Sequence, residues 1–86
     1  MFIKLPNTKY NSRKKEWIDG WVLLNPFQII SIEKDDEDAK CCVVLCVSDV
    51  TYYIKLSPGV MQKRVQDFME ENVLTKIYSQ QKDQQN

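Results

Sequence analysis

Two short segments of this 86-residue sequence carry most of the side chains that could do chemistry. One contains Cys41, Cys42 and Cys46, and the other runs from Lys9 to Trp17 and combines cations with aromatic rings. The chain has no histidine and only two glycines. Histidine is the commonest metal ligand and general base, and glycine-rich loops are what cradle phosphates. The sequence therefore predicts no metal site and no cofactor, and we expect no enzyme.

The three cysteines are best interpreted as reduced structural thiols. They lie in a segment of small and β-branched residues that predicts a strand, so Cys41 and Cys42 point to opposite faces. Cys42 and Cys46 share a face but lie about 13 Å apart along it. Zinc ligands converge at about 2 Å from the metal, so these residues do not form a zinc site. An odd number of clustered cysteines also argues against the disulfide framework of a secreted protein.

The segment from Lys9 to Trp17 has the composition of a surface that binds single-stranded nucleic acid. Such binding requires phosphate attraction together with a stacking ring. The candidate contacts are Lys9, Tyr10, Arg13, Lys14, Lys15 and Trp17. The alternative is a solvated loop whose Trp17 packs back on the core.

An acidic run, Glu33 to Asp38, follows later in the chain. It lacks the glycine and the terminal bidentate glutamate of a calcium-binding EF-hand, so we expect a solvated hairpin loop. Residues 1–20 hold five cations and two anions, a net charge of +3, and residues 31–40 hold two cations and five anions, a net charge of −3. This dipolar layout could orient a polyanion, or could dock molecules head to tail.

Composition and charge narrow the class of protein further. The chain is 43% hydrophobic and 28% charged, which is ordinary for one small globular domain. Its net charge is zero, unlike the uniformly basic surface of a dedicated nucleic-acid binder. It contains no run of about 18 apolar residues, and its first residues do not read as a signal peptide. We therefore expect a cytoplasmic protein with no membrane contact.

The pattern along the chain predicts strands first and one helix last. We expect an edge strand at Phe2–Leu5 ended by Pro6, an irregular segment from Asn7 to a turn at Asp19-Gly20, and strands at 21–24 and 29–32 separated by Asn25-Pro26. Residues 41–47 and 51–56 predict an antiparallel hairpin around Ser48-Asp49. Ser57 and Pro58 are typical of a helix start. The apolar stripe of that helix is Met61, Val65, Phe68, Met69 and Val73.

These elements predict an α+β fold, a four- or five-stranded, mostly antiparallel meander sheet with one C-terminal helix packed on one face. We expect a single domain at residues 1–78 and a disordered glutamine-rich tail at 79–86. Both faces of the strand at 41–47 are apolar, yet only one helix is available to cover them. Either the sheet curls into a partly open barrel, or its second face meets a second subunit or a partner. Our candidate interface is Cys42, Val44, Cys46 and Tyr53.

The order of these strands and turns resembles the small bacterial flagellar and swarming-motility family known as FlbD or SwrD. The matching residues lie between about residues 21 and 68: Val22-Leu-Leu-Asn25-Pro26, Ile29-Ile-Ser-Ile-Glu33, Val43-Val-Leu45, Ser48-Asp49, Tyr52-Tyr-Ile-Lys55, Ser57 and Val60. The resemblance implies a small cytoplasmic accessory protein without catalytic residues. Our functional prediction is a non-enzymatic module that acts by oligomerisation, for example as a homodimer, or by docking to another protein. The alternative is single-stranded nucleic-acid binding through residues 9–17.

Overall fold

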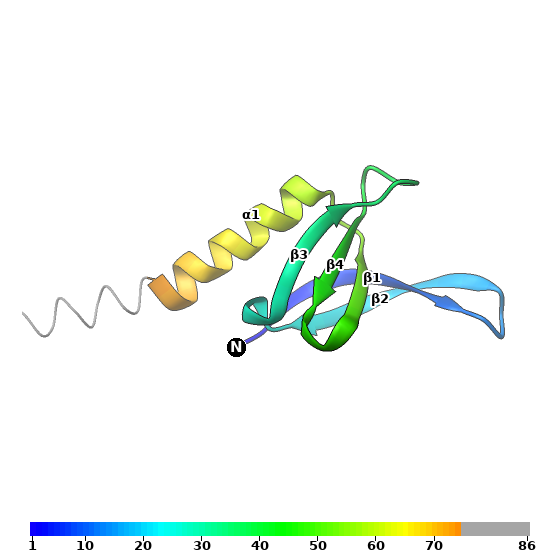
Figure 1. Ribbon diagram of the computed structural model, residues 1–86, viewed down its shortest axis with the longest axis horizontal. Coiled ribbons are helices and arrows are strands. Elements are labelled where there is room, and N and C mark those ends of the chain that lie inside the picture. Colours follow the sequence, from blue (N-terminus) through cyan, green and yellow to red (C-terminus); the bar gives the residue numbers. More distant parts are fainter. Residues whose placement is uncertain (75–86) are drawn as a thin grey trace, which may run out of the picture.

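The structure, a computed structural model, describes residues 1–74 and contains one antiparallel sheet with one α-helix packed on it (Figure 1). This confirms the predicted α+β fold. The elements are β1 (Ile3–Asn11), β2 (Glu16–Leu24), η1 (Pro26–Gln28), β3 (Ile29–Lys34), β4 (Cys42–Cys46), η2 (Val47–Asp49), β5 (Val50–Ile54), α1 (Pro58–Met69) and η3 (Glu70–Leu74). Within residues 1–74, no helix has the length and apolar character needed to cross a membrane.

The strands lie in the order β2-β1-β5-β4-β3. β3, β4 and β5 follow one another as a meander, and the β1–β2 hairpin joins them through pairing of β1 with β5. That pairing is short, with Asn7 opposite Ile54 and Thr8 opposite Tyr53. Next to it, the Lys55 amide donates to the Pro6 carbonyl at 2.9 Å. Pro6 has no amide proton with which to return the bond, so the ladder ends there.

Residues 7–20 are ordered as a hairpin, so the predicted irregular segment was wrong. β1 and β2 pair without a break from Ile3 opposite Leu24 to Asn11 opposite Glu16, which also places Asp19-Gly20 inside a strand. The predicted edge strand at Phe2–Leu5 was wrong as well, because β1 starts at Ile3, continues through Pro6 and lies between β2 and β5 rather than at an edge. The turn at residues 12–15 is held by the Asn11 carboxamide oxygen, which accepts hydrogen bonds from the Arg13 and Lys14 amides at 3.0 and 3.2 Å. The prediction failed because both faces of the outer half of this hairpin are largely in water, so its strands do not alternate between polar and apolar residues.

The other turns agree with the sequence patterns. The side chain of Asn25 accepts a hydrogen bond from the Phe27 amide at 3.0 Å and so caps η1 at the predicted Asn25-Pro26 turn. Between β4 and β5, Ser48 and Asp49 have φ angles of 64° and 60°. Two successive residues in the left-handed region reverse the chain tightly, which is why β4 and β5 pair as an antiparallel hairpin.

The core lies between the sheet and α1. Ser57 caps the helix as predicted, accepting a hydrogen bond from the Val60 amide at 3.4 Å. Met61 is fully buried, and Val65 and Phe68 pack on the core beside it, which confirms this part of the stripe. The side chain of Val73 and the tail predicted at 79–86 lie outside the described part of the chain. The buried hydrophobic residues are Ile3, Leu5, Leu24, Cys42, Val44, Cys46, Ile54 and Met61.

Candidate interaction surface

The two faces of the sheet have different surroundings. One face lies against α1 and carries the core side chains, and we call it the covered face. The opposite face, which we call the open face, carries large side chains in contact with water: Trp21 is 66% exposed, Trp17 55% and Tyr53 40%. Strand pairing places the following residues on the open face: Lys4, Thr8, Tyr10, Trp17, Asp19, Trp21, Leu23, Val43, Leu45 and Tyr53.

The predicted interface of Cys42, Val44, Cys46 and Tyr53 does not exist as one surface. Cys42, Val44 and Cys46 are buried on the covered face, while Tyr53 lies on the open face. The reason is the three-residue turn at Val47–Asp49, which pairs Val44 with Tyr52 and Val43 with Tyr53. The apolar face of β5 therefore lies on the same side of the sheet as Cys42, Val44 and Cys46 of β4. The uncovered side of β4 is the one that carries Val43 and Leu45.

Three aromatic rings form a continuous row across the open face. Tyr10 and Trp17 are opposite each other in the hairpin, with ring centroids 5.5 Å apart and planes tilted by 60°. Trp17 also contacts Tyr53 in a T-shaped arrangement, with centroids 5.4 Å apart and planes at 81°. Tilted and edge-on contacts at these distances are favourable for aromatic rings. The row joins the hairpin to β5 next to the last backbone pair, Thr8 with Tyr53, and leaves ring surface available to a partner.

The predicted nucleic-acid contacts all lie in the outer half of the hairpin, but they do not share one face. Tyr10 and Trp17 are on the open face. Lys9 is on the opposite face of the hairpin, which is the continuation of the covered face past the part that α1 covers. Arg13, Lys14 and Lys15 form the turn, and we call these three residues the basic turn. The structure therefore brings the cations together beside the ring pair and separates Lys9 from it.

Residues 35–38 of the acidic run lie in the β3–β4 loop, as predicted, whereas Glu33 and Lys34 belong to β3 and pair with Val43 and Cys42. Asp35 accepts a hydrogen bond from the Glu37 amide, and Asp38 accepts one from the Lys40 amide, both at 2.9 Å. These two carboxylates shape the loop, whereas Asp36 and Glu37 extend its charge into water. Within residues 1–74, no cluster of three or more potential ligands is arranged to hold a metal ion. We call Glu33, Asp35, Asp36, Glu37 and Asp38 the acidic wall.

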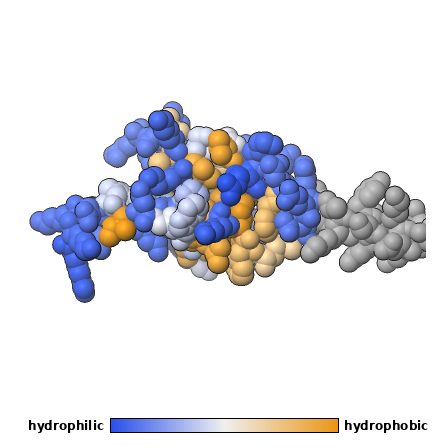
Figure 2. Space-filling model, turned by 180° about the vertical axis from the view of Figure 1, so that it is seen from behind, coloured by the Kyte–Doolittle hydropathy of each residue, from blue (hydrophilic) through white to orange (hydrophobic). Residues whose placement is uncertain are grey.

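An open groove of ≈ 640 Å³ lies between the acidic wall and the aromatic row. Its lining combines the five carboxylates of the wall with Trp17 and Tyr53 on the other side, and it also includes Asp19 and two lysines, Lys34 and Lys55, so that carboxylates outnumber cations six to two. Sequence reasoning identified both flanking segments but not the groove, because only the β1–β5 pairing brings them together. On the side seen in Figure 2, hydrophobic residues gather at the centre, with hydrophilic residues at the hairpin end on one side and on α1 on the other.

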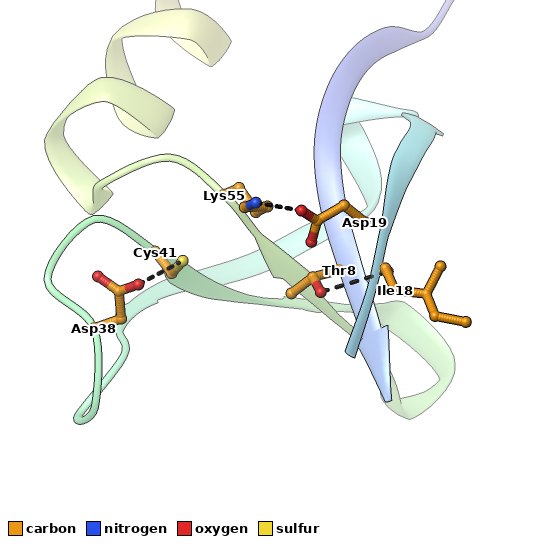
Figure 3. Close-up of polar contacts among 6 residues, drawn as sticks. All are labelled: Thr8, Ile18, Asp19, Asp38, Cys41 and Lys55. Carbon is orange, nitrogen blue, oxygen red and sulfur yellow. Dashed lines mark hydrogen bonds and ion pairs between the residues drawn. The ribbon is translucent and has the colours of Figure 1, made fainter. Parts of the chain in front are cut away.

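One ion pair crosses the groove floor. Lys55 Nζ lies 2.5 Å from Asp19 Oδ2. Lys55 directly follows β5 and Asp19 belongs to β2, so their side chains meet over β1, which lies between these two strands (Figure 3). Hydrogen bonds from Lys55 and then Thr8 hold the pKa of Asp19 below its ordinary value, and the bond to Asp19 raises the pKa of Lys55. Both groups are exposed, so the pair orients side chains more than it stabilises the fold.

The thiols have the properties of core side chains. Burial raises the pKa of Cys42 to about 11 and raises the pKa of Cys46 as well. The pKa of half-exposed Cys41 is raised by burial and then by Asp38, whose carboxylate accepts the thiol hydrogen at 3.5 Å (Figure 3). A thiol must ionise to act as a nucleophile or metal ligand, and these environments oppose ionisation.

Comparison of the chain with protein-family models, with curated proteins and with solved structures found no match.

Proposed function

We propose that this chain is a small non-enzymatic interaction module that docks to a protein, a copy of itself or another chain, through the open face of its sheet. The observation that carries the proposal is the set of exposed aromatic and aliphatic side chains on a sheet face opposite α1, the one α-helix among residues 1–74. Tryptophan and tyrosine are enriched at the centres of protein interfaces, where they bury much area at little entropic cost.

The chemistry of the surface supports the same function. The groove contains a thiol, Cys41, whose pKa is raised rather than lowered, and the chain has no histidine to serve as its base. The open face instead offers apolar contact area with charged groups at its margins, the layout of a protein interface with an apolar centre and a polar rim. The resemblance to the motility accessory family adds the same expectation of a non-catalytic accessory role.

The experiment that tests the proposal measures the size of the native complex in extracts of cells that express the chain. Trp17→Ser with Trp21→Ser removes apolar area from the open face without opening the core. Lys63→Ser with Gln66→Ser is the control on the exposed side of α1. We expect the first variant to elute as a free chain in size-exclusion chromatography, and the control to elute with the larger complex. A complex of unchanged size in the tryptophan variant would contradict the proposal.

A second candidate function, single-stranded nucleic-acid binding, is favoured by one observation. The Tyr10–Trp17 pair lies directly beside the basic turn, so a stacking ring and phosphate contacts are close together. The acidic wall faces the same row of rings and opposes a polyanion. Tryptophan fluorescence titrated with a mixed-sequence oligonucleotide distinguishes the two. Saturable quenching that weakens steeply with salt would favour nucleic acid, and no change at low salt would exclude it.

A further inference from the structure

We infer that the partner of the open face is a second copy of this chain, with the basic turn of each copy lying in the acidic groove of the other. This inference rests on the proposed function and names the partner. It starts from two charged segments of opposite sign that a single copy leaves without ion-pair partners. Among residues 1–74 the ion pairs are Lys55–Asp19 and Lys63–Asp67, and neither involves the basic turn or the acidic wall.

The two segments are placed so that they complement each other between copies. Figure 1 shows the hairpin tip and the β3–β4 loop projecting from the same side of the molecule, away from α1. The basic turn has three cations, and the wall has five carboxylates along one groove. Opposite charges at the margins of an apolar surface fix orientation and speed association, and like charges in the same place would oppose it.

The hairpin has the reach and shape to enter such a groove. Past the last pair with β5, its two strands continue for three residues each, Lys9–Asn11 and Glu16–Ile18, roughly 10 Å before the turn. The Asn11 side chain holds that turn in one shape, so little order has to be gained on docking. The arm entering the groove would cover Trp17 and Tyr53, which line it.

A twofold axis makes the arrangement closed and self-consistent. In such a dimer the same patch is used by both copies, so one operation places both turns in both grooves. The opposing aromatic rows then come together near the axis, where they are farthest from water. A basic peptide from another protein is the other occupant that this chemistry fits, and it differs in leaving the chain monomeric on its own.

The test is a charge-swap experiment read by sedimentation equilibrium of the full chain. The turn variant carries Arg13→Glu with Lys14→Glu, and the wall variant carries Asp36→Lys with Glu37→Lys. Asp35, Asp38 and Lys15 stay unchanged, because the two aspartates bond loop amides and Lys15 has a φ of 53°. Lys63→Glu with Arg64→Glu is a control of equal charge change on α1. We expect the turn variant and the wall variant, each measured alone, to have a dimer dissociation constant at least about tenfold higher than that of the wild type. The control should leave this constant unchanged.

Two rescue experiments test whether each copy places its basic turn in the groove of the other. Mixing the turn variant with the wall variant restores attraction at both contacts, and so does placing all four substitutions in one chain. We expect both to dimerise as the wild type does, and we expect wild-type dimers to weaken as salt rises. A wild-type chain that remains monomeric at high concentration overturns the inference, while the native-extract experiment still decides whether the open face docks to a different protein. A dimer indifferent to the swaps, or species that keep growing with concentration, overturns it as well.

Discussion

Neighbouring residues of β4 lie in opposite environments. Val44 is fully buried against α1, whereas Val43 is half-buried on the open face beside Tyr53. Because the two side chains are chemically identical, substituting each in turn compares the cost of losing core packing with the cost of losing a contact surface. Cys41 and Cys42, the two residues before Val43, show the same alternation, with Cys42 buried and Cys41 half-exposed.

The first prediction compares Val44→Ala with Val43→Ala. We expect Val44→Ala to lower the free energy of unfolding by about 2 kcal/mol, because it removes fully buried methyl groups and leaves a cavity. Val43→Ala should cost less than about 1 kcal/mol. Urea unfolding followed by circular dichroism measures both. Equal losses, or a larger loss at Val43, would show that we have assigned the covered face wrongly.

The second prediction concerns the pH dependence of stability. In the unfolded chain a thiol ionises near its ordinary pKa of 9.0, whereas folded Cys42 ionises near 11. As the pH rises, the unfolded chain therefore loses this proton first. The free energy of unfolding has its full value below pH 9 and decreases between pH 9 and 11. The pKa of Lys55 is also raised and adds in the same direction. Urea unfolding at pH 8, 9 and 10 should show a smaller decrease in Cys42→Ala than in wild type, and an identical decrease would contradict the assigned burial.

At the scale of elements, the β1–β2 hairpin is what makes the site. Its outer half carries the basic turn, the Tyr10–Trp17 pair and one side of the groove, although β1 touches the rest of the sheet over only a short stretch. The alternation of polar and apolar residues predicted the inner strands, the β4–β5 turn and α1. It did not predict the outer hairpin, since both its faces are largely in water. The available signal was the pairing of Tyr10 with Trp17 around a polar turn.

The register of β4 against β5 could also have been obtained from the sequence. A turn centred on Ser48 aligns Val44 with Tyr52, and the apolar alternation of β5 then decides which face of β4 is covered. What no local pattern contains is the β1–β5 pairing. It joins residues more than forty positions apart and depends on tertiary packing, so the groove could not be predicted.

The third prediction tests the strain in the β4–β5 turn. Asp49 has a φ of 60°, a conformation that glycine adopts without the steric cost of a Cβ atom. Asp49→Gly should therefore raise the free energy of unfolding by roughly 0.5–1 kcal/mol. Asp36→Gly is the matched control, because Asp36 does not have a positive φ and the added chain freedom should only destabilise. Thermal unfolding of the two variants checks this, and a loss of stability in Asp49→Gly would contradict the role of the turn.

At the scale of the whole molecule, a chain of zero net charge carries its charges in separated blocks. The basic turn and the acidic wall project from the same side (Figure 1), and Trp17 and Tyr53 line the groove beside the wall. A small domain has little core with which to stabilise itself, so burial of its open face in the proposed dimer would add to its stability. We therefore expect thermal stability to rise with protein concentration, and a transition temperature independent of concentration would count against self-docking.

The most direct test of the open face as the contact surface is site-specific photo-crosslinking in cells that express the chain. A benzophenone amino acid replaces Trp21 on the open face in one variant and Gln66 on the exposed side of α1 in another. We predict that illumination joins the chain to a protein, a second copy or another, from position 21 and yields little product from position 66. Crosslinks from position 66 with none from position 21 would contradict the proposal that the sheet docks through its open face.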